Sequence, residues 1–132
     1  MTIEELNILT KEFSNLFLKN KIKINSFSEL YDLDLNWPDT YPYNLLPGVY
    51  ALLDENKDLY YFGSTLVAIG ERFKKYFGYD SNKKCLKSMK YNNISFLTTV
   101  GFDDKIKYLI PALEYYLISK FNPPGNRNLK IK

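Results

Sequence analysis

The stretch PGVYALLDENKDLYYFGST, residues 47–65, contains two apolar runs that flank a polar turn. The first run is about Val49–Leu53, the second is about Leu59–Phe62, and the intervening residues 54–58 are polar. Two short runs rich in β-branched and aromatic residues, separated by a few turn-forming residues, predict a β-hairpin. The rest of the fold is expected to assemble around this hairpin.

Three tyrosines are grouped in the hairpin, near Gly48 and Gly63: they are Tyr50, Tyr60 and Tyr61. The chain contains no histidine, the side chain that most often moves protons in enzymes at neutral pH. Two interpretations follow. Either the tyrosines only pack in a sheet, or one of them performs chemistry that other proteins assign to histidine.

Outside the hairpin, the residue patterns predict helices and one more strand. Thr2 followed by Glu5 is a capping-box pattern, and Pro111 is typical of the first turn of a helix. The expected elements are an N-terminal amphipathic helix over about 3–19, short helices near 27–32 and 82–90, a helix that ends near Phe77, a strand over 94–100 and a last helix over about 111–121. We therefore expect an α+β domain at residues 47–132, with a small three-stranded antiparallel sheet flanked by helices. Residues 1–46 are expected to form an N-terminal helical extension.

The formal net charge of +3 conceals an asymmetry along the chain. Residues 1–60 contain 5 lysines and 10 acidic residues, a net charge of −5, whereas residues 61–132 contain 13 basic and 5 acidic residues, a net charge of +8. The basic residues of the window 70–90 are Arg72, Lys74, Lys75, Lys83, Lys84, Lys87 and Lys90. Such a surface attracts polyanions, of which nucleic acid is the commonest candidate. The alternative is a solvated lysine face.

Cysteine and histidine are too scarce for several kinds of site. Cys85 is the only cysteine, which excludes an intramolecular disulfide, agrees with a reducing cytoplasm and predicts a buried, inert thiol. Zinc has almost no ligands here, so a metal would need oxygen ligands, as magnesium and manganese do. No apolar run approaches the roughly 18 residues of a membrane span. The acidic N-terminal segment is unlike a signal peptide, and we expect a cytoplasmic protein.

Two tripeptides in the hairpin carry a family resemblance. Gly48-Val49-Tyr50 is followed, after ten residues, by Tyr61-Phe62-Gly63. The pair resembles the signature of the GIY-YIG nuclease family, with valine and phenylalanine in place of the two isoleucines. Both replacements are conservative for buried strand positions.

Further motifs follow in the family's order, so that the resemblance covers residues 47–127. Arg72-Phe73 precedes Tyr76 by one helical turn, and ALEYYLISKFNPPGN, residues 112–126, is similar to the family's final block. That block has a glutamate on a helix, a proline-rich turn and an asparagine, which here are Glu114 and Asn126. One departure is that Arg72 lies nine residues after Gly63, where many members have eight.

The resemblance implies a DNA endonuclease that hydrolyses phosphodiester bonds with one divalent ion, Mg²⁺ or Mn²⁺. In that reading Glu114 binds the metal, Tyr50 is the general base, Arg72 holds the phosphate, and Tyr61 and Tyr76 orient water or phosphate. The residues expected to bind substrate are Gly63, Ser64, Lys74, Lys75 and Asn126.

A tyrosine base has to ionise. An ordinary tyrosine has a pKa of about 10, so roughly one in a thousand is a phenolate at neutral pH, and nearby cations must favour the anion. Some family members have a lysine close to the second tripeptide, but the sequence assigns no lysine to that role here.

Two alternatives use the same fold without catalysis. One is a catalytically inactive nucleic-acid-binding module, and the other is a protein-interaction module that docks through the amphipathic N-terminal helix. The presence of Tyr50, Arg72 and Glu114 favours the enzyme. The sequence indicates neither the DNA substrate nor an oligomeric state.

Overall fold

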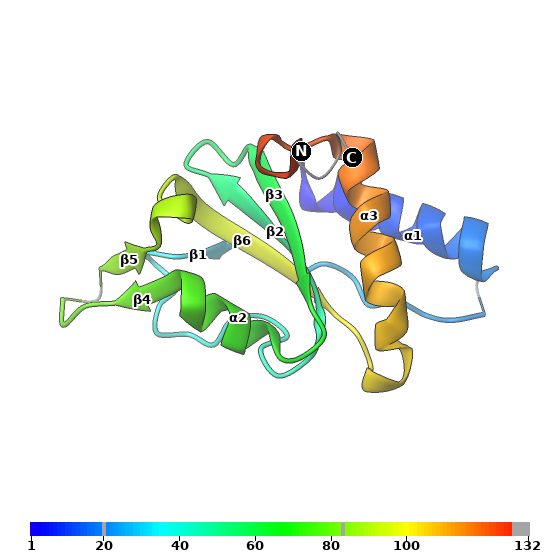
Figure 1. Cartoon of the computed structure of the whole chain (residues 1–132), viewed down its shortest axis with the longest axis horizontal. Coiled ribbons are helices and arrows are strands. Elements are labelled where there is room, and N and C mark those ends of the chain that lie inside the picture. The colour runs from blue at the N-terminus through cyan, green and yellow to red at the C-terminus, as the bar shows by residue number, and fades with distance from the viewer. Residues whose placement is uncertain (20, 83, 128–132) are drawn as a thin grey trace.

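A four-stranded antiparallel sheet forms the centre of the computed structural model, which describes residues 1–19, 21–82 and 84–127 (Figure 1). The strand order is β1-β6-β2-β3. The strands are β1 Tyr31–Asp32, β2 Gly48–Asp54, β3 Leu59–Thr65 and β6 Ile94–Gly101. The predicted α+β class and antiparallel sheet are confirmed, and the short β1 is a fourth strand beyond the three that were expected.

The predicted hairpin is β2 and β3, whose register pairs Tyr50 with Gly63 and Leu52 with Tyr61. The turn between the strands is stabilised by Asp54, whose carboxylate accepts hydrogen bonds from the backbone N–H groups of Asn56 and Asp58 at 2.9 and 3.0 Å. This local pairing fixes which tyrosines share a face, because side chains alternate along a strand.

Alternation along β2 divides the core into two halves. Val49, Ala51 and Leu53 pack on one face with α1 (Ile3–Phe13) and α3 (Ile110–Phe121). Tyr50 and Leu52 point to the other face, toward α2 (Ile69–Tyr76). Because β3 is an edge strand, residues from both faces can meet at its open side.

The N-terminal helix forms as predicted. The Thr2 hydroxyl accepts a hydrogen bond from the Glu5 N–H at 3.1 Å, and Leu6 and Phe13 bury its apolar stripe. The chain then continues as a π-helical segment, Ser14–Leu18.

The predicted helix near 27–32 is wrong. Instead, Tyr31 and Asp32 form β1, which pairs with β6, and the Ser28 N–H donates a hydrogen bond to the Thr99 carbonyl at 2.8 Å. This pairing joins residues about 70 positions apart, so the local sequence gave no sign of it.

The predicted helix near 82–90 is also wrong. The chain runs from α2 directly into β4 (Phe77–Tyr79), turns, and returns as β5 (Cys85–Lys87) before a short 3-10 helix, η2 (Met89–Tyr91). Gly78 is therefore a strand residue. The extended conformation lets Phe77 and Cys85 both point into the core, and the Cys85 thiol is buried as expected.

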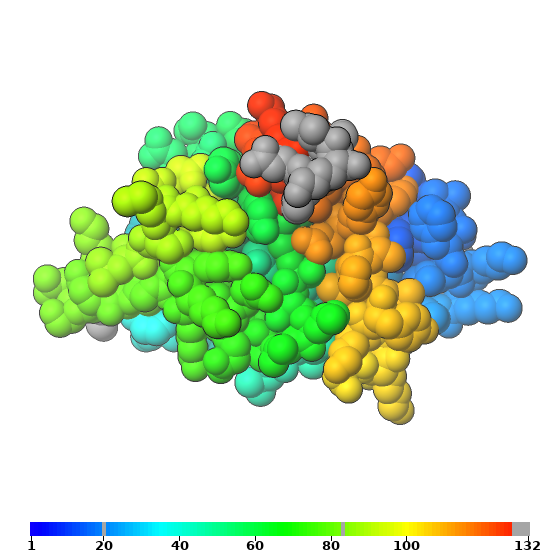
Figure 2. All heavy atoms as spheres, in the orientation of Figure 1, coloured from blue at the N-terminus to red at the C-terminus, as the bar shows by residue number. Residues whose placement is uncertain are grey.

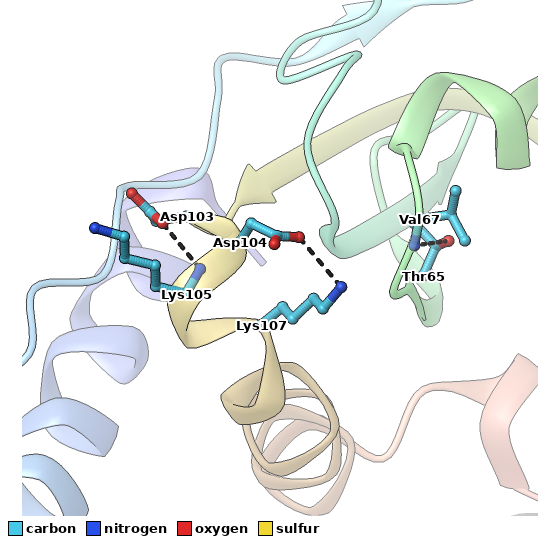
Figure 3. Close-up of polar contacts among 6 residues, drawn as sticks. All are labelled: Thr65, Val67, Asp103, Asp104, Lys105 and Lys107. Atoms are coloured by element: carbon cyan, nitrogen blue, oxygen red, sulfur yellow. Dashed lines mark hydrogen bonds and ion pairs between the residues drawn. The ribbon is translucent and has the colours of Figure 1, made fainter.

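The segment before α3 has a turn of its own. The Asp103 carboxylate accepts a hydrogen bond from the Lys105 N–H at 2.9 Å, and Asp104 forms an ion pair with Lys107 at 3.2 Å in the 3-10 helix η3 (Asp104–Leu109) (Figure 3). Pro111 lies in the first turn of α3, as predicted. A last 3-10 helix, η4, spans Pro124–Asn126. Across the described ranges, no helix has the length and apolarity needed to span a membrane.

Candidate active site

Four tyrosines from four different elements form a cluster beside β3. Tyr50 is on β2, Tyr61 on β3, Tyr76 at the end of α2 and Tyr91 at the end of η2. The ring centroids of Tyr50 lie 6.5 Å from those of both Tyr61 and Tyr76, and the Tyr91 ring lies 4.5 Å from Tyr76 and 5.7 Å from Tyr61. The two tyrosines of the tripeptide motifs therefore do meet across the hairpin.

Gly63 leaves the space that Tyr50 occupies. A Cβ added at Gly63 would lie 2.4 Å from the Tyr50 hydroxyl oxygen and from the ring carbon that bears it. No side chain fits in that space, so the glycine lets the Tyr50 hydroxyl reach across the edge strand. The Tyr50 hydroxyl also donates a long hydrogen bond, 3.4 Å, to that of Tyr76.

Glu114 approaches the same strand from the opposite face of the sheet. Its carboxylate accepts a hydrogen bond of 2.6 Å from the Ser64 hydroxyl, and Ser64 directly follows Gly63. Burial raises the pKa of Glu114, while the Ser64 hydroxyl and the positive charge of Arg72 act against the rise. The tyrosine cluster and the carboxylate thus converge on two consecutive residues, Gly63 and Ser64.

Arg72 and Tyr76 lie one turn apart on α2, which packs on the tyrosine side. Interaction with Tyr76 raises the pKa of the Arg72 guanidinium, and its burial acts in the other direction. An arginine is charged at any physiological pH. The site therefore contains a permanent cation close to a phenol and within electrostatic reach of Glu114.

The tyrosines differ in how readily they ionise. Burial raises the pKa of Tyr50, which is 1% exposed, and the hydrogen bond that it donates to Tyr76 raises it further. Burial also raises the pKa of Tyr61. Tyr76 is different: burial acts against its ionisation, but interactions with Tyr50, Arg72 and Tyr91 outweigh it and lower the pKa. Within the cluster, Tyr76 is the tyrosine that loses its proton first.

Comparison with known families matches this chain to the GIY-YIG catalytic domain over residues 46–128. The chain belongs to the GIY-YIG family. GIY-YIG domains are nuclease domains, so membership implies nuclease chemistry on a nucleic-acid substrate, for which these enzymes generally use a divalent metal ion. A comparison with curated proteins found no match.

A divalent metal in this GIY-YIG site would have one carboxylate from the protein. The residues that the structure describes contain no group of three or more histidine, cysteine, aspartate or glutamate side chains that could hold a metal. Glu114 is a partly buried carboxylate whose pKa is raised by its burial, and the Ser64 hydroxyl beside it is a second oxygen. Oxygen donors of this kind suit Mg²⁺ or Mn²⁺, which commonly keep several water ligands and bind substrate phosphate.

Three of the residues expected to bind substrate lie outside the tyrosine cluster. Asn126 is 1% exposed, and its side-chain amide accepts a hydrogen bond from the Phe62 N–H at 2.7 Å and donates one to the Phe62 carbonyl at 2.9 Å. It covers the open backbone edge of β3 and so acts as a brace. Lys74 and Lys75 are exposed on α2, and Lys74 pairs with Glu71 at 3.4 Å.

Two residues near the site had no assigned catalytic role in the sequence. Tyr91 closes the cluster and is 1% exposed. The ammonium of Lys90 lies 5.6 Å from the centroid of the Tyr61 ring and 5.4 Å from that of Tyr91, and its charge acts against the raised pKa of Tyr61. For Lys90, the signal in the sequence was the basic window that contains it.

Proposed function

We propose that this chain is a divalent-metal-dependent DNA endonuclease that hydrolyses phosphodiester bonds at the Gly63–Ser64 edge of β3. The observation that carries the proposal is the convergence there of a carboxylate, a fixed cation and a tyrosine with a lowered pKa, namely Glu114, Arg72 and Tyr76. Packing alone does not account for these three groups, because each is charged or readily ionised in a half-buried site, where an apolar side chain would pack as well.

The residues would divide the reaction among them. Glu114, with Ser64 beside it, would hold Mg²⁺ or Mn²⁺, and the bound ion would polarise the phosphate and neutralise developing charge. Arg72 would hold a phosphate oxygen through its planar, always charged guanidinium. Tyr61 would orient water or phosphate from the adjacent position of the cluster.

Proton transfer is proposed to run through a tyrosine pair. Tyr50 is the general base, and its hydroxyl hydrogen-bonds to Tyr76, whose phenolate form is favoured. As the oxygen of the attacking water bonds to phosphorus and the bond to the leaving oxygen breaks, the water proton moves to Tyr50 while the Tyr50 proton moves to Tyr76. The pair thus takes up one proton, and the buried Tyr50 does not have to be ionised beforehand.

The proposal also includes the domain boundaries and the location of the protein in the cell. Residues 47–132 would form the nuclease domain, of which 128–132 lie outside the described residues, and residues 1–46 would form a helical extension. A cytoplasmic location agrees with the single, buried Cys85 thiol.

The experiment that tests the proposal is incubation of the purified chain with supercoiled plasmid, branched DNA and single-stranded DNA. Each substrate is incubated with Mg²⁺, with Mn²⁺ and with a chelator. We expect cleavage only with the metal. Salt-dependent binding without cleavage of any substrate would favour the inactive DNA-binding module, and neither binding nor cleavage would favour the protein-interaction module.

A further inference from the structure

The β4–β5 hairpin is a short arm that projects from one end of the molecule (Figure 1). Figure 2 shows it as the pointed left-hand end of the surface, beyond the main body. Three paired residues in each strand give it a length of about 10 Å. No role in the proposed chemistry needs such an arm.

The arm is fixed to the body of the protein. The Tyr79 ring stacks on Trp37 with centroids 3.9 Å apart and planes 7° from parallel, and the Tyr79 hydroxyl donates a hydrogen bond to the Leu33 carbonyl at 2.8 Å. Phe77 is buried at its base, and Cys85 is buried next to its turn. A fixed arm loses little conformational entropy when it binds a partner, so it is already organised for binding.

Both ends of the arm join the candidate active site. Its first strand begins at Phe77, directly after Tyr76, and the Ser88 N–H at its other end donates a hydrogen bond to the Tyr76 carbonyl at 2.9 Å. Two residues later Lys90 lies over the Tyr61 and Tyr91 rings. A nucleic-acid strand that reaches the tyrosine cluster therefore has the arm beside it.

The charges of the arm are predominantly positive. Lys84 is exposed and Lys87 is half-buried, and Lys90 is exposed just beyond the arm in η2. None of the three forms an ion pair with another described residue. The acidic residue of the turn is Asp80, whose carboxylate is engaged by the backbone N–H groups of Asn82 and Lys84 at 2.9 and 3.0 Å. Lys83 lies outside the described residues.

The outer face of the arm is apolar and open. Leu86 is 54% exposed and stands opposite Gly78, where an added Cβ would meet no atom within 4 Å. Met89, which follows the arm in η2, is 90% exposed. Side chains alternate along β5, so Leu86 points away from the face of Cys85 and Lys87. Lys84 and Lys87 thus flank the exposed leucine, and positive charges around an exposed apolar residue match a DNA backbone, which presents phosphates separated by apolar sugars.

We infer that the β4–β5 arm binds the DNA backbone next to the phosphate that is cleaved, with Lys84 and Lys87 on phosphates and Leu86 against sugars. The inference rests on the proposed function for its choice of DNA as the partner. An arm of about 10 Å spans about three nucleotides, since duplex phosphates along one strand recur every 3.4 Å or so of the helix axis. The contacts read no base sequence, so they enlarge the footprint without changing the sequence preference.

The test measures binding and not cleavage. The full chain carrying Glu114→Gln is titrated with a fluorescent 30-base-pair duplex at several salt concentrations between about 50 and 200 mM, a range over which phosphate contacts show clearly. The comparison is with the same protein carrying Lys84→Ala and Lys87→Ala. The matched control carries Lys11→Ala and Lys23→Ala, which remove two exposed charges from the N-terminal region. Circular dichroism melts establish that all three proteins are folded.

Loss of the two arm lysines is expected to weaken binding several-fold and to reduce the slope of log K against log salt by about 2, close to one per phosphate contact. The control is expected to leave the slope unchanged. Equal changes in both variants, no change in the arm variant, or no DNA binding by the parent would each overturn the inference. Cleavage by the wild-type chain is scored separately. If the arm variant has a reduced slope but the wild type cleaves no DNA, DNA binding by the arm stands and the proposed nuclease function is refuted. If the wild type cleaves DNA but the slope is unchanged in the arm variant, the nuclease function stands and DNA binding by the arm is refuted.

Discussion

Replacing Asn126 with alanine tests whether this residue braces the edge strand or contacts substrate. The wild-type side chain makes two hydrogen bonds to the backbone of Phe62, at 2.7 and 2.9 Å, in a place where both residues are almost fully buried. Alanine leaves one N–H and one C=O without partners. A buried, unsatisfied polar group costs about 1–3 kcal/mol, so we expect the free energy of unfolding to fall by about 2–6 kcal/mol.

Chemical denaturation followed by circular dichroism measures this loss, and a thermal melt should show a shift of roughly 4 °C per kcal/mol for a domain of this size. Asn93→Ala is the matched control, because Asn93 is exposed. A change of less than about 0.5 kcal/mol in Asn126→Ala, together with weaker DNA binding, would refute the bracing role and return Asn126 to the substrate-binding set.

Three further predictions concern the site. Tyr76→Phe should lower the cleavage rate by about 10²-fold or more and move its rise to higher pH in a pH–rate profile, because the pKa of Tyr76 is lowered whereas that of Tyr50 is raised; an unchanged profile would exclude Tyr76 as the proton acceptor. Gly63→Ala should destabilise the fold by about 1–3 kcal/mol through overpacking against Tyr50 and slow cleavage, and wild-type stability in a urea titration would contradict this. Glu114→Gln should make the metal-free protein more stable at pH 7. The pKa of Glu114 in the folded protein is raised above its ordinary value of 4.5, so the folded state binds the proton more tightly than the unfolded state does. The stability of the wild type therefore falls as the pH rises through the folded-state pKa, whereas glutamine has no proton to lose. The advantage of the variant should disappear at acid pH, and equal melting temperatures of the two proteins at pH 7 would show that the carboxylate causes no strain.

The elements that the sequence predicted well are those specified by nearby residues. The β2–β3 hairpin combines apolar alternation with a polar turn, the N-terminal helix has its Thr2 cap, and α3 has Pro111 in its first turn. The meeting of Tyr50 with Tyr61 followed from the same local register.

The elements that it missed depend on partners far away in the chain. The two residues of β1 are strand only because β6 lies beside them. The β4–β5 arm is held by Trp37, which comes forty or so residues earlier and stacks on Tyr79. In both places the local sequence favoured a helix, and tertiary contacts decided otherwise.

The sequence suggested residues for the candidate site but carried no information on the electrostatics among them. Glu114 and Ser64 are fifty positions apart, and their hydrogen bond arises from the packing of α3 beside β3. The sequence favoured Tyr50 as the tyrosine that must ionise, whereas its burial and its hydrogen bond favour the phenolate on Tyr76. No spacing of residues in the sequence indicates which tyrosine ionises most readily.

The central claim is that Glu114 makes this site a metal-dependent nuclease. The most direct measurement is the rate of plasmid nicking with Mg²⁺ under single-turnover conditions for the wild type, for Glu114→Gln and for Glu71→Gln, which removes an exposed glutamate on α2. We predict nicking by the wild type and by Glu71→Gln, and a fall of at least about 10²-fold in Glu114→Gln with DNA binding retained. Nicking by Glu114→Gln at the wild-type rate would contradict the account.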